Sequence, residues 1–184
     1  MDSHFDKLSI KNITLENFCK LSSDNIEMIR LWRNSLEVKK FMFTQDEITP
    51  SQQKKFIETL RTDNSKIYFL ARLKDEPIGS IYFYDLDFEQ MKCFWGYYLD
   101  PKLIGASYGL LLEYTVAEVV FEILRLEKLF CEGFVSNKTA VKIHREFGFE
   151  ELKNDGDLIL MLLRKEVWNS KKKNVEFLIS KLIS

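Results

Sequence analysis

The sequence predicts an α/β protein built on a mixed β-sheet with helices on both faces. Runs with β-strand patterning alternate with helical runs, in the order strand, two helices, three strands, helix, strand, helix and two strands. With 184 residues, 46% of them hydrophobic, the chain is long enough to form one domain with a substantial core. We therefore expect one domain over residues 1–166 and a helical tail over residues 167–184.

Two helix-start signals follow the first expected strand, which covers residues 7–14. Residues 24–27 (DNIE) have the pattern of a capping box, in which Asp24 accepts an early backbone N–H of the helix. Residues 49–52 (TPSQ) form a second box, with proline at the first helical position, where its missing N–H costs nothing. In the helix that this second box opens, Gln53 shares the inward-facing stripe with Phe56, Ile57 and Leu60.

Three strands with short connections come next and predict an antiparallel meander: residues 66–73, 78–86 and 91–101. Residues 108–126 are apolar nearly all round, which indicates a helix covered on both sides. A strand over residues 129–135 and a short helix over residues 137–149 follow, and a hairpin that turns at Asp155-Gly156 completes the sheet.

The tail places Val175, Leu178 and Leu182 on one helical face. Docking on its own domain, or on the second subunit of a homodimer, explains this pattern better than membrane contact.

The composition argues against several classes of partner. A net charge of −1 provides no long-range attraction to nucleic acid. Three cysteines, Cys19, Cys93 and Cys131, lack metal-ligand spacing and predict reduced thiols and no metal. The first ten residues lack the pattern of a signal peptide, and no apolar stretch is long enough to cross a bilayer. We therefore expect a cytoplasmic protein that binds neither membrane nor nucleic acid.

The stretch KLIGASYG, residues 102–109, lies between a strand and a long helix. Its small residues let the backbone approach a ligand, and the free N–H groups of the first helical turn favour an anion such as a pyrophosphate. A tight turn that requires glycine is the structural alternative. The glycine spacing fits neither a Walker loop nor a dinucleotide fingerprint.

Strand alternation places Glu132 on the same face as Phe130 and Phe134. A carboxylate between two aromatic rings is expected to be poorly hydrated and suited to act as a general base. A glutamate at a strand end, paired with a lysine, is the structural alternative.

His144 lies beside a buried stripe expected to contain Ala140, Ile143 and Phe147. Two interpretations are open, a core residue with a satisfied ring and a proton donor in an active site. Asn137, at the start of the same helix, is most simply its N-cap.

Taken together, these motifs resemble those of the GCN5-related N-acetyltransferase (GNAT) superfamily over residues 7–165. The resemblance implies a splayed mixed sheet, and acetyl-CoA as the co-substrate without a metal. The family's acetyl-CoA loop has the pattern R/Q-x-x-G-x-G/A. Its defined positions are taken here by Lys102, Gly105 and Ser107, which is a degenerate match. Ala106 lies between the last two. The resemblance also implies that the backbone of Tyr97, Tyr98 and Leu99 holds the pantetheine arm and the thioester.

The family helix N-x-x-A-x-x-x-Y matches Asn137 and Ala140, with His144 at the tyrosine position. Asn137 would then bind pantetheine as well as cap the helix. The tyrosine protonates the departing thiolate in this family, and an imidazolium can do the same.

Several stretches of the chain look like one group within the superfamily: IRLWRN…FMF, the helix that contains Phe56, GSIYF, FWGYY and the glutamate in LFCEGF. They resemble the pseudaminic acid pathway enzymes that acetylate UDP-4-amino-4,6-dideoxy-N-acetyl-β-L-altrosamine. This likeness implies Glu132 as the base for the 4-amino group and Arg33 as the ligand of the nucleotide phosphates. It implies an apolar pocket for the 6-methyl sugar made of four residues: Met42, Phe43, Phe56 and Phe94. Gln53 stands where these enzymes can carry a phosphate-binding histidine.

The expected mechanism is direct transfer in a cleft where the sheet splays open. Glu132 deprotonates the amine, a backbone N–H near Tyr98 stabilises the oxyanion, and His144 protonates the sulfur. One alternative is an acetyltransferase of protein or ribosomal-protein N-termini. The other is a catalytically inactive CoA-binding module.

Overall fold

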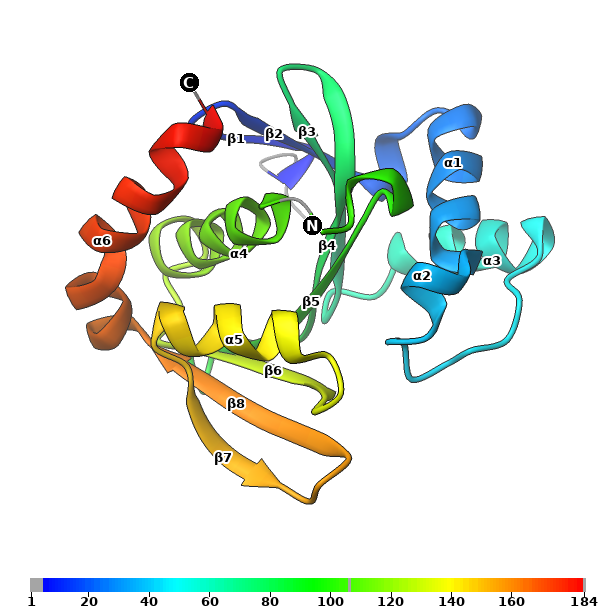
Figure 1. The fold of residues 1–184 in the computed structure, drawn as a ribbon. Helices are drawn as coiled ribbons and strands as arrows, with labels where there is room; N and C mark the ends of the chain where they lie inside the picture. Colours follow the sequence, from blue (N-terminus) through cyan, green and yellow to red (C-terminus); the bar gives the residue numbers. More distant parts are fainter. Residues whose placement is uncertain (1–4, 106, 184) are drawn as a thin grey trace. The chain divides into compact units, whose positions relative to one another are not determined.

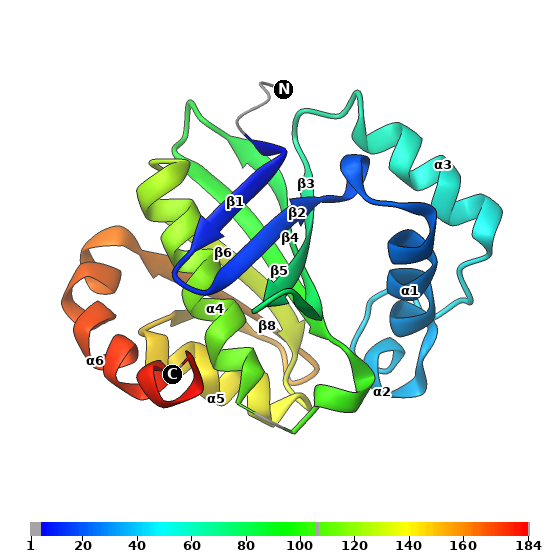
Figure 2. The ribbon, with the colours of Figure 1, turned by 90° about the horizontal axis from the view of Figure 1, so that it is seen from above.

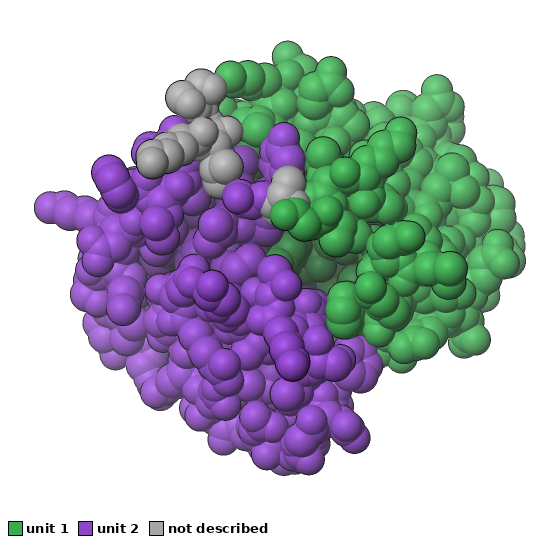
Figure 3. Space-filling view, viewed as in Figure 1, with its two compact units in different colours: residues 1–83, 97–106 green, residues 84–96, 107–184 purple. Residues whose placement is uncertain are grey.

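The computed structural model describes residues 5–105 and 107–183. Two compact units make up the chain, residues 1–83 with 97–106 and residues 84–96 with 107–184 (Figure 3). Strands β4 (Glu76–Asp87) and β5 (Lys92–Leu99) each contribute residues to both units.

The first unit carries an antiparallel run of strands in the order β1 (Lys7–Ile10), β2 (Ile13–Asn17), β3 (Ile67–Leu73) and β4 (Figure 1). The prediction of a single strand over residues 7–14 is wrong. The chain reverses at Lys11, which has a positive φ of 52°, and β1 and β2 pair as a hairpin with Ile10 opposite Ile13. A second reversal, at Lys74 and Asp75, joins β3 to β4, which fits the short connection expected between these strands.

Helices α1 (Ser23–Asn34), α2 (Leu36–Lys39) and α3 (Pro50–Leu60) also belong to the first unit, where α1 contacts both others (Figure 2). The predicted cap of α1 is wrong, because Ser22 caps it by accepting the N–H of Asn25 at 3.3 Å. Asp24 instead lies in the first turn, where its charge complements the helix dipole. The second capping box is confirmed, since Thr49 and Gln52 each accept a backbone N–H from the other.

The second unit has its own strand run in the order β5, β6 (Lys128–Phe134), β8 (Leu158–Arg164) and β7 (Glu150–Asn154). Strand β6 pairs parallel to β5 and antiparallel to β8, and β7 pairs antiparallel to β8. This confirms the expected mixed sheet and the closing hairpin.

Three helices that contact one another flank these strands: α4 (Tyr108–Glu118), α5 (Lys138–Phe147) and α6 (Lys165–Ile183) (Figure 1). Helix α4, which continues as a π-helical turn over Val119–Ile123, is buried along almost its whole length, as its apolar sequence predicted. Helix α5 ends at Gly148, whose φ is 97° and where a Cβ would lie 2.7 Å from the side chain of Val167.

Helix α6 docks on its own unit through Trp168, Val175 and Ile179, all of them buried. The expected apolar face is wrong in one member, because Leu178 is 50% exposed. The side chain of Leu182 lies outside the residues whose burial is described. Among the helices of residues 5–105 and 107–183, none is long and apolar enough to cross a membrane.

Candidate active site

His144 and Glu113 form a buried pair inside the second unit. Both carboxylate oxygens of Glu113 lie 2.9 Å from Nδ1 of His144. The side chain of His144 is 12% exposed and that of Glu113 only 1%. Helix α4 supplies Glu113 from the middle of its apolar sequence, and the last turn of α5 supplies His144.

The charges of this pair support each other. Burial by itself lowers the pKa of the His144 imidazole, but Cys131 and Glu113 raise it, and the net pKa lies well above its usual value. Burial raises the pKa of Glu113, and the adjacent imidazole opposes that shift. The arrangement expected at neutral pH is therefore an imidazolium whose Nδ1–H donates to a carboxylate.

Aromatic rings surround the imidazole of His144. Trp95 meets it edge to face with centroids 5.6 Å apart, and Phe149 lies at 5.3 Å. The expected buried stripe of α5 is partly wrong, because Val141 and Phe147 are its buried members while Ala140 and Ile143 are half-buried. His144 thus has the packing expected of a core residue together with the raised pKa that a proton donor requires, so it combines features of both interpretations.

Sequence reasoning missed Glu113 altogether. It is the kind of residue that can be detected from sequence, since a carboxylate amid LLLEYTV on an apolar helix requires a partner. The identity of that partner could not be inferred, because 31 residues separate Glu113 from His144.

Glu132 occupies β6 opposite Leu160 of β8 and is exposed to solvent. The expectation of a poorly hydrated carboxylate is therefore wrong. Of its predicted ring neighbours, Phe130 is only half-buried and stacks on Phe94 at 5.1 Å, so the rings do not cover Glu132. Phe94 in turn packs against Tyr84 with centroids 5.3 Å apart.

The ladder between β5 and β6 ends with Trp95 opposite Cys131, and β6 then continues to Phe134. Beyond this pair, Tyr97, Tyr98 and Leu99 complete β5 within the first unit. There Tyr98 and Leu99 are buried, and the Asp100 N–H after the strand donates to the Ile78 carbonyl at 3.0 Å.

The expected anion loop contains a short 3-10 turn at Pro101–Leu103. Lys102 is exposed, and its N–H donates to the carboxylate of Asp100 at 3.0 Å. Gly105 has a φ of 92°, and a Cβ there would meet no atom within 4 Å. Ala106 lies outside the described residues.

Helix α4 begins after Ser107, whose side chain accepts no hydrogen bond from the helix. Its first-turn N–H groups are therefore not capped by that side chain. At the start of α5, by contrast, Asn137 accepts the N–H of Ala140 at 3.4 Å, which confirms it as the N-cap.

Arg33 has a guanidinium that forms no ion pair with the described residues of the first unit. Its Nη2 donates to the Thr44 carbonyl at 2.7 Å, whereas its buried Nη1 has no hydrogen-bond partner among the described residues. Burial lowers the pKa of Arg33, with Tyr98, Tyr82 and Tyr68 close enough to oppose the shift. The sequence also allows an i,i+4 ion pair between Arg33 and Glu37, which would make Arg33 an ordinary surface residue. That pair does not form between these two described residues.

The apolar residues expected around the sugar occupy different environments. Met42 and Phe56 pack against the buried cluster of the first unit, and Phe56 meets Tyr68 edge to face at 5.0 Å. Phe43 is 60% exposed, and Phe94 belongs to the second unit. Gln53 is buried on α3, as its position on the inward stripe predicted.

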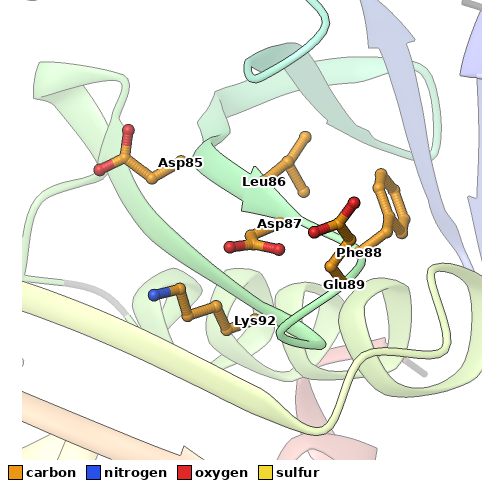
Figure 4. Close-up of a pocket in the computed structure, with 6 residues that line it drawn as sticks. All are labelled: Asp85, Leu86, Asp87, Phe88, Glu89 and Lys92. Carbon is orange, nitrogen blue, oxygen red and sulfur yellow. The ribbon is translucent and has the colours of Figure 1, made fainter.

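A shallow depression lies at the β4–β5 hairpin of the second unit (Figure 4). Its lining consists of Asp85, Leu86, Asp87, Phe88, Glu89 and Lys92. None of the predicted site residues belongs to this lining. Within residues 5–105 and 107–183, no group of three or more His, Cys, Asp and Glu side chains could hold a metal ion.

Comparisons with known proteins agree with these features. The family description "Acetyltransferase (GNAT) domain" matches residues 13–150. Two curated proteins named acetyltransferase PseH, from Campylobacter jejuni subsp. jejuni serotypes O:2 and O:23/36, are each 31% identical over 153 residues, which is 83% of this chain and 94% of theirs.

Solved structures give the same result. The crystal structure of Campylobacter jejuni N-acetyltransferase PseH matches with a TM-score of 0.71 and 28% identity, over 84% of this chain and 99% of that one. Its complex with acetyl coenzyme A matches at 0.69 and 29% identity, over 83% and 99%. Spermidine N-acetyltransferase from Vibrio cholerae, in complex with CoA and spermine, reaches 0.78 over 87% and 99% but shares 18% identity, so it shows the fold alone.

Proposed function

The chain belongs to the GNAT acetyltransferase family as an N-acetyltransferase that uses acetyl-CoA, and we propose that its acceptor is the 4-amino group of a UDP-linked 4-amino-4,6-dideoxy sugar. This places the reaction in the pseudaminic acid pathway. The likeness to the PseH proteins supports the pathway, and the environment of Arg33 supports the substrate class.

The environment of Arg33 carries the proposal. Among the described residues, the guanidinium keeps a buried N–H without a partner and forms no ion pair with a carboxylate, so it is prepared to donate to an anion. Arg33 is tied to the Thr44 carbonyl, so its planar fork is already oriented. A diphosphate supplies the acceptor oxygens and the negative charge that this site lacks.

The aromatic and aliphatic side chains of the first unit suit a deoxysugar. Met42 and Phe56 are only partly buried on the cluster, so each keeps an apolar surface available to a ligand. A 6-methyl group packs favourably against such surfaces, whereas a fully hydroxylated sugar would lose hydrogen bonds to water there.

Several features of the chain fit acetyl-CoA. Gly105, in its left-handed conformation, leaves open space where a side chain would stand, so the backbone can approach a pyrophosphate. The first turn of α4 has N–H groups that Ser107 does not cap, and such groups bind anions. We assign the remaining contacts to Lys102, to Asn137 and to the backbone of Tyr97, Tyr98 and Leu99. When bound, acetyl-CoA supplies an activated acetyl thioester.

The protein's own residues then move two protons. Exposed Glu132 accepts a proton from the substrate ammonium, directly or through one water. His144, held as an imidazolium, donates a proton to the leaving sulfur. Both steps belong to direct transfer, because the amine receives the acetyl group without an acyl-enzyme.

The free thiols of Cys19, Cys93 and Cys131 support a cytoplasmic location, where cysteines stay reduced.

Release of free thiol tests the proposed function. Purified protein with acetyl-CoA and UDP-4-amino-4,6-dideoxy-N-acetyl-β-L-altrosamine should release CoA at a rate far above hydrolysis. Peptides with free N-termini, supplied in place of the sugar nucleotide, should not raise CoA release above hydrolysis. Acetylation of the peptides without reaction of the sugar would refute the proposed acceptor.

The variant Glu132→Gln tests the base. Turnover should fall about 100-fold, the size expected for a general base, while acetyl-CoA binding measured by calorimetry stays unchanged. A variant with full turnover would remove Glu132 from the mechanism.

A further inference from the structure

Building on the proposed role of His144 as the acid, we infer that Glu113 is a positioning residue that orients the His144 ring and keeps it ready to donate its proton. Glu113 itself touches neither substrate nor co-substrate in this scheme. It acts through the imidazole, from a helix that otherwise buries apolar side chains.

The geometry determines which nitrogen of His144 is available. Both oxygens of Glu113 lie 2.9 Å from Nδ1. When Glu113 is ionised its carboxylate can only accept, so Nδ1 then carries the hydrogen. Nε2 is then the nitrogen left for chemistry. The contacts with Trp95 and Phe149 restrict rotation of the ring about this bond.

The charged and titratable neighbours of His144 favour the same state. Helix α4 contributes Glu113 and strand β6 contributes Cys131, and both raise the pKa of the imidazole against the effect of burial. On α5 itself, Glu146 acts on Glu113 and raises the pKa of that carboxyl. Glu113 contacts Nδ1 of His144 through both oxygens, so its removal should lower the pKa of the imidazole.

The need for such a residue follows from the replacement of tyrosine by histidine. A tyrosine hydroxyl, with a pKa of about 10, keeps its proton at neutral pH without help. An imidazole as buried as His144 would lose its proton there, because burial disfavours its charged form. A carboxylate in contact with Nδ1 reverses this preference. Glu113 therefore compensates for the departure from the family motif at position 144.

An NMR titration measures the protonation of His144 beside Glu113, and it does not require turnover. The chain has two histidines, so His4→Gln leaves His144 as the only imidazole signal. In this background His144 should titrate above its usual pKa, with Nδ1 protonated in the neutral tautomer. The addition of Glu113→Gln should lower the pKa of His144 by about one unit or more.

Kinetics then separate positioning from mere stability. With Glu113→Gln, the alkaline limb of the kcat profile should move to lower pH together with the NMR titration, and activity should recover at acidic pH. KM for acetyl-CoA should not change. Glu118→Gln is the matched control, because it removes another largely buried carboxylate from α4, one that contacts Trp168 and Lys172 instead. It should lower Tm and leave both pH profiles unchanged.

A double variant sharpens the test. In His144→Tyr, which restores the family residue, adding Glu113→Gln should leave kcat unaltered or improve it. Equal losses from Glu113→Gln in both backgrounds would overturn the inference.

The remaining outcomes are equally decisive. An imidazole that titrates at its ordinary value in the parent protein overturns the inference, and that measurement needs no variant at position 113. An NMR shift without any change in kcat overturns it too, and shows that His144 is not the acid. If the parent protein turns over no sugar nucleotide, the proposed function fails, while the NMR titration still decides whether Glu113 controls the proton of His144.

Discussion

Arg33 in the first unit and His144 in the second are both basic groups that are at least half-buried, and their surroundings differ. Among the described residues, Arg33 has a carbonyl and three tyrosines nearby but no carboxylate partner, and its Nη1 has no hydrogen-bond partner. His144 has a buried carboxylate in contact through both oxygens.

This difference corresponds to two uses of a positive charge. A charge that the fold leaves uncompensated is available to an anionic ligand, which gains the electrostatic stabilisation that the protein did not provide. A charge that the fold compensates is retained as an internal source of protons. In the proposed function Arg33 binds substrate and His144 transfers a proton, and the structure distinguishes the two by the carboxylate in contact with His144.

The largest effect is expected from removal of the compensated cation. His144→Ala should lower kcat about 100-fold at neutral pH, the typical contribution of a general acid. His144→Tyr serves as the control and should retain most of the activity. Steady-state kinetics at several pH values measure the loss, and an unchanged rate would make His144 a core residue.

The uncompensated cation should give a smaller effect of a different kind. Arg33→Met should raise KM for the sugar nucleotide about tenfold or more, because charge-assisted hydrogen bonds are lost, and leave KM for acetyl-CoA as it was. Exposed Arg61, in the same unit, provides the control Arg61→Met, which should leave both constants unchanged. Equal effects from the two variants would indicate general electrostatics and not a specific site.

Glu118 is a carboxylate with a structural role, and it can be compared with Glu113, the carboxylate that contacts His144. Glu118 accepts from Trp168 at 3.2 Å and pairs with Lys172 at 2.7 Å, so it ties α6 to α4. Glu118→Gln should lower the free energy of unfolding by about 1–3 kcal/mol, measured by urea denaturation. Glu122→Gln, whose carboxylate is more exposed, should have little effect.

The smallest effect concerns the pH dependence of stability. The pKa values of both His144 and Glu113 are raised in the folded protein, so folding takes up protons. The contribution of His144 is complete below its unfolded pKa and is lost as pH rises through its folded pKa. That of Glu113 is lost in the same direction, beginning near its ordinary value. Stability should therefore decline from mildly acidic to alkaline pH.

Denaturation across this pH range, compared with the variant Glu113→Gln/His144→Gln, measures that decline. The double variant should show a flatter profile. Parallel curves would mean that the pair does not control the pH dependence.

Local signals were sufficient for much of the architecture. The Thr49 capping box, the Asn137 cap, the burial of α4 and the closing hairpin all depend on neighbouring residues, so the sequence predicts them. The predictions from sequence were wrong where two local conformations are both compatible with the residues. Ser22 rather than Asp24 caps α1, and a reversal at Lys11 replaces a continuous strand, because pairing and packing select between similar local patterns.

The sequence by itself determined the order of most elements after residue 49, the family resemblance and the identity of His144 as an unusual residue at a tyrosine position. Only the tertiary structure decided the state of that residue. Its partner Glu113 is 31 positions away on another helix, and its surroundings combine burial with a counter-charge. Tertiary structure also decided that Glu132 is exposed. Solvation and electrostatics depend on all atoms near a group in space, and strand alternation or helical spacing specifies only the direction in which a side chain points.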